Sequence, residues 1–325
     1  MMRSISALLS PRGRLARLPI LIFHRVLPSR DPLRPGDPDA ATFEWQMKLV
    51  ARQFNVLPLS EACERWGQRS LPARALCITF DDGYADNVEL ALPILKRHGL
   101  HSTFFIATGF MNGGRMWNDT VIEWVRGLQE GELDLRSLDL GVRSIRTIED
   151  KRSTLGAVLT SLKYLPLERR LEHVGKLVDD RADRLPTDLM MTDAQVNELL
   201  AEGMEVGGHT VNHPILARVD HDTALWEIQE GKRQLEEITG HAVRLFAYPN
   251  GKPGIDYGPE HVQMVREAGF AAAVSTAWGA GRRSSDLFQL PRFTPWQRSP
   301  TQFHMEMMRN YMRRGMPAAA DSAKV

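Results

Sequence analysis

Two adjacent carboxylates, Asp81 and Asp82, end an apolar run in the stretch CITFDDGY, residues 77 to 84. Consecutive residues of a strand point to opposite sides, so the two side chains are expected to face different surroundings. One carboxylate can then ligate a metal ion while its neighbour accepts a proton from water. The ordinary alternative is that Asp-Asp-Gly shapes a turn or caps the helix that follows.

A second candidate is the pair His209 and His213 in the stretch GGHTVNH. If the stretch forms a helical turn, residues four apart share one face and both imidazoles reach one point. A carboxylate from elsewhere would complete a two-histidine, one-carboxylate set, which suits zinc or a related divalent ion and leaves positions open for water and substrate. A structural role is the alternative for the two histidines considered alone.

Three further polar residues follow predicted strands: His24 in IFHRV, and Tyr248 and Asn250 in FAYPNG. In an α/β barrel, chemistry takes place at the carboxyl ends of the strands, where the loops begin. We therefore expect four strand ends to bring two carboxylates and three imidazoles to one rim.

The elements that must position these residues alternate between short apolar runs and helical patterns. Helical patterns include TFEWQMKLVARQF and MTDAQVNELLAEG, the second with a capping box of Thr192 and Gln195. Seven runs are predicted strands: 18–23, 75–80, 102–108, 204–209, 243–249, 270–276 and 290–293. Strand, helix and strand in succession predict an α/β fold, a closed or nearly closed barrel of about seven parallel strands.

The predicted barrel spans residues 18–314 and carries a helical insertion at about 112–190, where charged helical patterns interrupt the alternation. We expect residues 1–17 to be an N-terminal leader and the small, polar residues 315–325 to form a disordered tail.

Composition excludes some classes of function. The chain has 41 Lys and Arg against 40 Asp and Glu, so its net charge of +1 provides no field to attract nucleic acid. Its two cysteines, Cys63 and Cys77, form no metal-binding spacing and imply no disulfide framework.

The N-terminus contains no uninterrupted apolar stretch of signal-peptide length before Leu18, because arginines divide it. We therefore expect a cytoplasmic protein. The alternative is peripheral contact with a membrane, in which Ile5, Leu8 and Leu9 and the nearby arginines form a short basic amphipathic segment.

The motifs TFDDGY, GGHTVNHP and FAYPNG, each after a strand and in this order, resemble the polysaccharide deacetylase family. This is the NodB-homology domain of carbohydrate esterase family four, and FAYP points to one subgroup. The resemblance covers roughly residues 18–300 apart from the insertion. It implies a distorted (β/α) barrel and metal-dependent removal of acetyl groups from N- or O-acetylated sugars of poly- or oligosaccharides, exopolysaccharides among them.

Carried over by position, the resemblance makes Asp81 the general base. It makes Asp82, His209 and His213 the ligands of a divalent metal, most readily Zn²⁺. The backbone amide of Asn250, at a position where the family often has tyrosine, would then bind the oxyanion in a loop that also contains Tyr248, and Thr210 would steady the histidine loop.

The chain departs from the family pattern in two places. Ala247 stands where many members have an arginine that orients the catalytic aspartate, so Arg292 in the later LPR segment is our candidate for its positive partner. A surface ion pair is the alternative for Arg292. No late Leu-x-His motif is present, so His24 is the candidate general acid, in preference to His304.

Substrate contacts are the least defined part of the prediction. Tyr84 and Trp117 are candidates to stack on a sugar ring, as are Phe110 and Trp296, although each could instead belong to the core. Asp119 could contact a sugar hydroxyl or cap a helix. Three classes of function stay open: a carbohydrate deacetylase, a hydrolase of a non-sugar amide on the same scaffold, and an inactive carbohydrate-binding protein.

Overall fold

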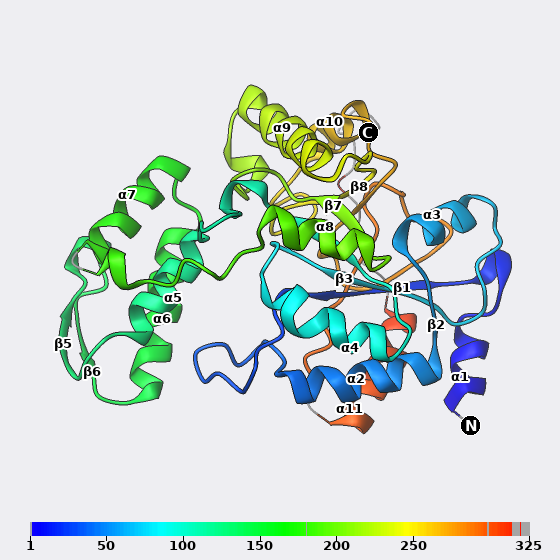
Figure 1. The fold of residues 1–325 in the computed structure, drawn as a ribbon, viewed down its shortest axis with the longest axis horizontal. Helices are drawn as coiled ribbons and strands as arrows, with labels where there is room; N and C mark the ends of the chain where they lie inside the picture. The colour runs from blue at the N-terminus through cyan, green and yellow to red at the C-terminus, as the bar shows by residue number, and fades with distance from the viewer. Residues whose placement is uncertain (1, 180, 298, 314–318, 320–325) are drawn as a thin grey trace.

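The computed structural model describes residues 2–179, 181–297, 299–313 and 319, so nearly all of the predicted tail lies outside the described residues. Its centre is one curled sheet with the strand order β10-β1-β3-β4-β7-β8-β9, in which β2 also pairs with β3 (Figure 1). The strands are β1 (Leu18–Phe23), β2 (Asn55–Val56), β3 (Ala75–Phe80), β4 (Thr103–Ile106), β7 (Glu205–Gly208), β8 (Leu245–Ala247), β9 (Ala272–Val274) and β10 (Ala280–Gly281).

The sheet is almost entirely parallel, as the sequence predicts. Strands β1, β3, β4, β7, β8 and β9 pair in parallel along the path, whereas the two-residue β10 pairs antiparallel with β1. Every residue of β1 and β3 is buried, which agrees with their uninterrupted apolar sequences. The sheet curls into a half-barrel, so the predicted distorted (β/α) barrel is confirmed.

The predicted last strand, residues 290–293, is not a regular strand. It makes isolated parallel bridges instead, Leu290 with Val274 of β9 and Phe293 with Leu21 of β1. This segment therefore lies between the two ends of the curled sheet, and it carries Arg292 into the interior.

Helices cover the outside of the sheet (Figure 1). Asn87–Ala91 is a π-helical turn that leads into α4, and Gly240 ends α9 in the left-handed conformation with φ +67°. The predicted capping box of Thr192 and Gln195 is present at the start of α8. These helices are α2 (Ala40–Gln53), α3 (Leu59–Gly67), α4 (Leu92–Arg97), α8 (Asp193–Ala201), α9 (His221–Thr239), α10 (Pro259–Glu267) and α11 (Pro300–Met312).

A row of aromatic rings packs between the sheet and α2. Phe80 stacks on Phe23 and on Phe104, with centroids 5.4 Å and 4.9 Å away, and Phe43 of α2 meets them edge-on. Such packing fixes the strands relative to one another. The strand ends that carry the polar residues are thereby held in a fixed arrangement.

The insertion forms its own lobe at the carboxyl ends of the strands, on the left of Figure 1. It contains α5 (Trp117–Arg126), α6 (Ile148–Lys163) and α7 (Leu167–Val178) around a separate apolar cluster. It also contains an antiparallel hairpin of β5 (Gly131–Asp134) and β6 (Val142–Ile145), which the sequence analysis did not predict. The insertion is therefore mixed rather than purely helical.

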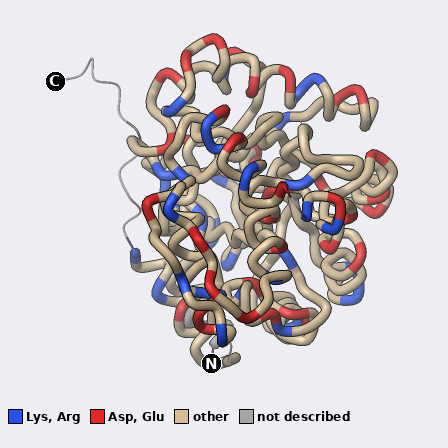
Figure 2. The backbone as a smooth tube through the Cα atoms, turned by 90° about the vertical axis from the view of Figure 1, so that its left-hand side faces the viewer, with Lys and Arg blue, Asp and Glu red and all other residues tan. Residues whose placement is uncertain are grey.

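The N-terminal segment begins with a helix, α1 (Met2–Leu9), which lies beside α2 and α11 at the opposite end of the molecule from the insertion (Figure 1). Among the described residues, none of the helices combines the length and apolar character needed to cross a membrane. Charges of both signs are interspersed along the chain in Figure 2, in agreement with the net charge of +1.

Candidate active site

A cavity of about 430 Å³ opens at the carboxyl ends of the strands. One side is formed by strand ends and the loops that follow them, with His24, Asp81, Asp82 and Asn250 among its residues. The insertion forms the other side through α5, α6 and α7. Residues from distant parts of the sequence thus meet at one rim, where the sequence analysis expected them.

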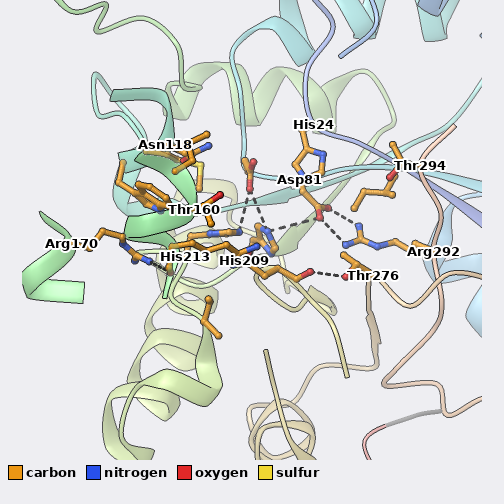
Figure 3. A pocket seen from close by; sticks show the side chains of 18 of the residues that line it. His24, Asp81, Asn118, Thr160, Arg170, His209, His213, Thr276, Arg292 and Thr294 are labelled. Carbon is orange, nitrogen blue, oxygen red and sulfur yellow. Dashed lines mark hydrogen bonds and ion pairs between the residues drawn. The ribbon is translucent and has the colours of Figure 1, made fainter. Parts of the chain in front are cut away.

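Asp82, His209 and His213 lie close enough to hold one metal ion, since one ligand atom from each fits within 4.8 Å of the others. Asp82 Oδ1 is 3.5 Å from Nε2 of His209 and 3.5 Å from Nε2 of His213. The two imidazole rings meet edge to face, with 4.7 Å between centroids (Figure 3). The predicted cluster is therefore assembled, and no other such group occurs in the part of the chain that the structure describes.

The two histidines meet for a different reason from the one predicted. The stretch is a loop rather than a helical turn, with Thr210 at φ +66° and His213 at φ +51°. Left-handed conformations at non-glycine residues are uncommon and need support from neighbouring structure. Thr210 supplies part of it, because its hydroxyl donates to the His209 carbonyl at 2.5 Å and accepts from the His213 amide at 3.1 Å.

Helix α9 supports the same loop through two residues that the sequence analysis missed. The buried carboxylate of Glu227 accepts hydrogen bonds from the backbone amides of Val211 and Asn212, both at 2.8 Å. A Cβ on Gly231 would lie 2.8 Å from the Thr210 backbone, so α9 approaches the loop too closely for any other residue. One acidic residue among many in a charged helix gives no sequence signal of such a role.

The residues present suit a divalent cation. His209 Nδ1 lies 2.7 Å from the Ala247 carbonyl oxygen, to which it donates, so Nε2 faces Asp82 as a lone-pair donor. Asp82 Oδ1 is buried and has no hydrogen-bond partner among the described residues. A buried carboxylate oxygen in that state is costly unless a cation balances it.

The charges of this cluster are set by burial and by one another. Burial alone would raise the pKa of Asp82, but contact with His209 and His213 holds it well below its usual range. Burial and the neighbouring His209 lower the pKa of His213 to about 3. An ionised carboxylate beside a neutral imidazole is the state in which both groups can ligate a metal.

Asp81 lies beside this cluster and forms a buried ion pair with Arg292. Nη1 and Nη2 of Arg292 each lie 2.7 Å from one Asp81 oxygen, and the arginine side chain is fully buried. Arg292 also donates to the Ser275 carbonyl and to the Thr79 hydroxyl. The surface ion pair considered for Arg292 is therefore wrong.

Arg292 determines the charge of Asp81. Burial alone would raise the pKa of the carboxyl, but the charge of Arg292 outweighs that effect and holds the pKa below its ordinary value. Asp81 Oδ2 also lies 4.0 Å from His209 Nε2, beside the metal cluster. Asp81 is thus an ionised carboxylate close to any ligand that Asp82, His209 and His213 would hold.

His24 and Asn250 both line the cavity, as expected for residues at strand ends. The His24 carbonyl accepts a hydrogen bond from the Asn87 side chain at 2.8 Å, which fixes the turn after β1. Asn250 has φ +59°, and its carbonyl accepts from the Thr276 hydroxyl at 2.6 Å. Its backbone amide donates to no described residue, so it is available to a ligand.

Three residues considered for the site lie behind it. Tyr84 is 1% exposed and is absent from the cavity lining, and its hydroxyl lies 2.9 Å from Asp119 Oδ2. Asp119 is itself fully buried and pairs with Arg34, so neither contacts a sugar. Tyr248 is also fully buried, stacked on Tyr257 at 3.8 Å.

Trp117 does line the cavity, but the guanidinium of Arg170 packs against its ring. Trp296 is exposed and lies outside this cavity. Phe110 packs beside Tyr84, behind the cavity wall. The aromatic wall nearest the strand ends comes instead from Trp278 and Phe293, which the sequence analysis did not single out.

Comparisons with known proteins agree with this geometry. A family model described as polysaccharide deacetylase matches residues 68–132 and 169–273, more than half of the chain. YxkH of Bacillus subtilis (strain 168), a protein named for the same family, is 20% identical over 278 residues, which are 85% of this chain and 71% of YxkH.

Solved structures show the same fold at low sequence identity. The Streptococcus pyogenes deacetylase PplD, in complex with acetate, has a TM-score of 0.60 and 18% identity over 91% of this chain and 99% of its own. IcaB from Ammonifex degensii has a TM-score of 0.56 and 19% identity over 94% and 99% of the two chains.

The fold and the site therefore define a class of protein: an α/β half-barrel with an Asp-His-His cluster and a separate buried aspartate. The chain belongs to the polysaccharide deacetylase family. Membership implies a hydrolase that acts on acetylated polysaccharide. The FAYP-type subgroup stays a prediction.

Proposed function

We propose that the protein is a metal-dependent hydrolase that removes acetyl groups from an N- or O-acetylated sugar of a poly- or oligosaccharide, an exopolysaccharide among the candidates. One observation carries the proposal. Asp82, His209 and His213 converge on one point in the cavity, and the ionised Asp81 lies directly beside them.

Asp82, His209 and His213 would hold the metal, and zinc suits this ligand set. When bound, a divalent ion polarises a carbonyl group and lowers the pKa of water. Asp82 contributes the negative charge of the set, while the hydrogen bond from His209 to Ala247 fixes the imidazole that faces it.

Asp81 is the residue that would accept the proton of the attacking water. A base must be ionised at the working pH, and the buried Asp81 meets that condition because Arg292 balances its charge. Arg292 is a positioning residue here, since it acts through Asp81. Its two parallel hydrogen bonds also fix the plane of the carboxylate.

The backbone amide of Asn250 would donate to the oxyanion that forms on the acetyl group. His24 would protonate the leaving nitrogen or oxygen, since it lines the cavity close to Asp81 and Asp82.

The proposed role of His24 predicts that His24→Ala lowers kcat by roughly a hundredfold, the contribution typical of a general acid. Acetate release under saturating substrate measures this, with zinc content confirmed for both proteins. Unaltered turnover in the variant would remove His24 from the mechanism.

A hydrolase of a small non-sugar amide is the second candidate. The insertion closes one side of the cavity, and a closed pocket favours a short substrate over the middle of a long polymer. An inactive carbohydrate-binding protein fits less well, because such a protein has no need of Asp81, Asp82, His209 and His213 together.

Acetate release from a panel of acetylated sugars and oligosaccharides tests the proposal. We expect activity in the zinc-loaded protein, loss after chelation, recovery when zinc is returned, and none in Asp81→Asn. The variant should still bind zinc, because Asp81 is outside the ligand set. Acetate from none of the sugars, with zinc bound, would favour the non-sugar amide hydrolase.

We also propose peripheral contact with an anionic membrane, retaining the cytoplasmic location as a prediction. Leu8 and Leu15 are 82% and 76% exposed at the N-terminal end of β1. They line a shallow hollow together with exposed Arg12, Arg14 and Arg283. Exposed leucines among arginines suit the interface of an anionic bilayer.

A further inference from the structure

Arg170 lies in the wall that the insertion contributes to the cavity, near the start of α7. The residue is only 4% exposed. Its Nη1 donates to the Lys163 carbonyl at 3.2 Å, and its guanidinium packs 4.9 Å from the centroid of the Trp117 ring. Its Nε is buried and has no acceptor among the described residues.

Arg170 differs from the other arginines buried near the site. Arg292 pairs with Asp81, Arg25 pairs with Asp86, and Arg34 pairs with Asp119. No described carboxylate pairs with Arg170, and burial lowers the pKa of its guanidinium. A buried cation without a counter-charge is unfavourable, so an anion brought by a ligand would be stabilised here.

Two residues near Arg170, namely Lys163 and Asn118, add further hydrogen-bonding groups to this wall of the cavity. Lys163, the last residue of α6, lines the cavity and is half-buried. Its ammonium group lies 5.6 Å from the centroid of the Tyr164 ring and forms no ion pair with a described carboxylate. Asn118 of α5 also lines the cavity, and its Oδ1 is buried without a donor among the described residues. Two cations and an amide thus face the cavity from three helices of the insertion.

The opposite wall differs, because Arg292, the arginine on that side, already has Asp81 as its counter-charge. Figure 3 shows Arg170 and Arg292 on opposite sides of the cavity, with His209 and His213 between them. A substrate with a negative group at one end would be attracted to the cations of the insertion, which have no carboxylate partner among the described residues. This attraction would orient such a substrate with its neutral acetyl group toward Asp81 and the histidines.

We propose that Arg170, with Lys163, forms a subsite for an anionic group, a carboxylate or a phosphate, on the acetylated saccharide. The inference rests on the proposed function, and it names the substrate class as an acidic acetylated saccharide. Arg170 offers a planar fork of donors to such a group, and Lys163 adds a mobile charge. A neutral sugar would leave the buried guanidinium without a counter-charge.

The test compares three acetylated sugars as ligands of the zinc-loaded, full-length protein: N-acetylglucosamine, N-acetylglucosamine 6-phosphate and N-acetylmuramic acid. The first is neutral, the second carries a phosphate and the third a carboxylate. Binding is measured by calorimetry in Asp81→Asn, so that the ligand is not consumed. Acetate release is measured with the wild type.

We expect at least one anionic sugar to bind at least tenfold more tightly than the neutral one, with the advantage falling as sodium chloride is raised. Arg170→Gln should reduce this advantage by roughly tenfold to a hundredfold, the effect of losing a charged hydrogen-bond partner. Arg170→Lys should retain part of it. Arg169→Gln, which removes an exposed arginine next in sequence, should leave it unchanged.

Equal binding of the neutral and anionic sugars would overturn the subsite. So would equal weakening of all three in Arg170→Gln, since that pattern indicates only packing against Trp117. The stronger of the two anionic ligands shows whether phosphate or carboxylate is preferred. An anionic preference without acetate release from these three sugars would keep the subsite, and the deacetylase would be rejected if the panel of acetylated oligosaccharides also gave no acetate.

Discussion

Adjacent aspartates acquire different tasks here because the backbone turns between them. Asp82 has φ +77° and Gly83 has φ +89°, so the chain reverses immediately after β3. Asp81 consequently faces Arg292, while Asp82 faces the two histidines. The sequence predicted this separation from strand geometry, but the left-handed aspartate that produces it had no local signal.

At the scale of single residues, we predict that Arg292→Gln shifts the acidic limb of the pH profile of kcat/KM to higher pH. Arg292 lowers the pKa of Asp81, so its removal raises that pKa, and the base becomes protonated at a pH where the wild type is still active. A pH profile of the zinc-loaded protein measures the shift. Arg292→Lys, which keeps the charge, should shift less.

Because Arg292 is fully buried, the variant must first be shown to fold like the wild type. Circular dichroism and zinc content should match the wild type before the profiles are compared. An unmoved acidic limb in a folded Arg292→Gln protein would show that Asp81 does not depend on Arg292 for its charge.

At the scale of elements, the strands were easier to predict than the loops that carry the chemistry. The runs 18–23 and 75–80 were identified to the residue, because strands buried on both faces have continuous apolar sequences. The hairpin of β5 and β6 was missed, since its strands are short, mostly exposed and charged. The 209–213 loop was mistaken for a helical turn, because its left-handed residues depend on α9.

Arg292 and Arg170 mark the limit of prediction for the site. Arg292 could be proposed only from the resemblance to a family, because 211 positions separate it from Asp81. Arg170 lies in the charged run LERRLEHVGK, where nothing distinguishes it from the exposed Arg169 beside it. Arg170 differs from Arg169 in being buried in the folded protein, and this burial cannot be predicted from one sequence.

We predict that Gly231→Ala lowers zinc affinity by roughly tenfold or more, the usual cost of disturbing the support of a metal ligand. The added methyl group would lie 2.8 Å from the Thr210 backbone and push the loop that carries His209 and His213. Competition with a zinc-binding dye measures the affinity. Gly175→Ala in α7, where a Cβ meets nothing within 4 Å, is the matched control.

At the scale of the whole molecule, the N-terminal hollow and the cavity lie at opposite ends of β1. Residues 16 and 17 border the hollow, whereas Ile22 and His24 line the cavity. Six residues of strand separate the two by about 20 Å. A protein bound to a membrane through Leu8 and Leu15 would therefore present its cavity away from the lipid.

We predict that the protein sediments with vesicles of phosphatidylcholine and phosphatidylserine, and less with phosphatidylcholine alone. Arginines near an anionic surface contribute about 1 kcal/mol each, and salt screens them. Arg12→Glu with Arg14→Glu should weaken sedimentation, and more so at low salt. Arg136→Glu, on the exposed hairpin of the insertion, should leave sedimentation unchanged. An equal loss of sedimentation in the two variant proteins would contradict the proposal.

The position of Arg292 late in the chain also sets an order in which the site can be completed during synthesis. A nascent chain that has left the ribosome as far as Ala247 already holds Asp82, both histidines and the α9 residues that support their loop, whereas the partner of Asp81 has yet to be made. Domains fold from the N-terminus as they emerge. Under the proposed function, the metal would therefore be held before Arg292 neutralises Asp81, so the growing polypeptide would bind zinc before it could hydrolyse a substrate.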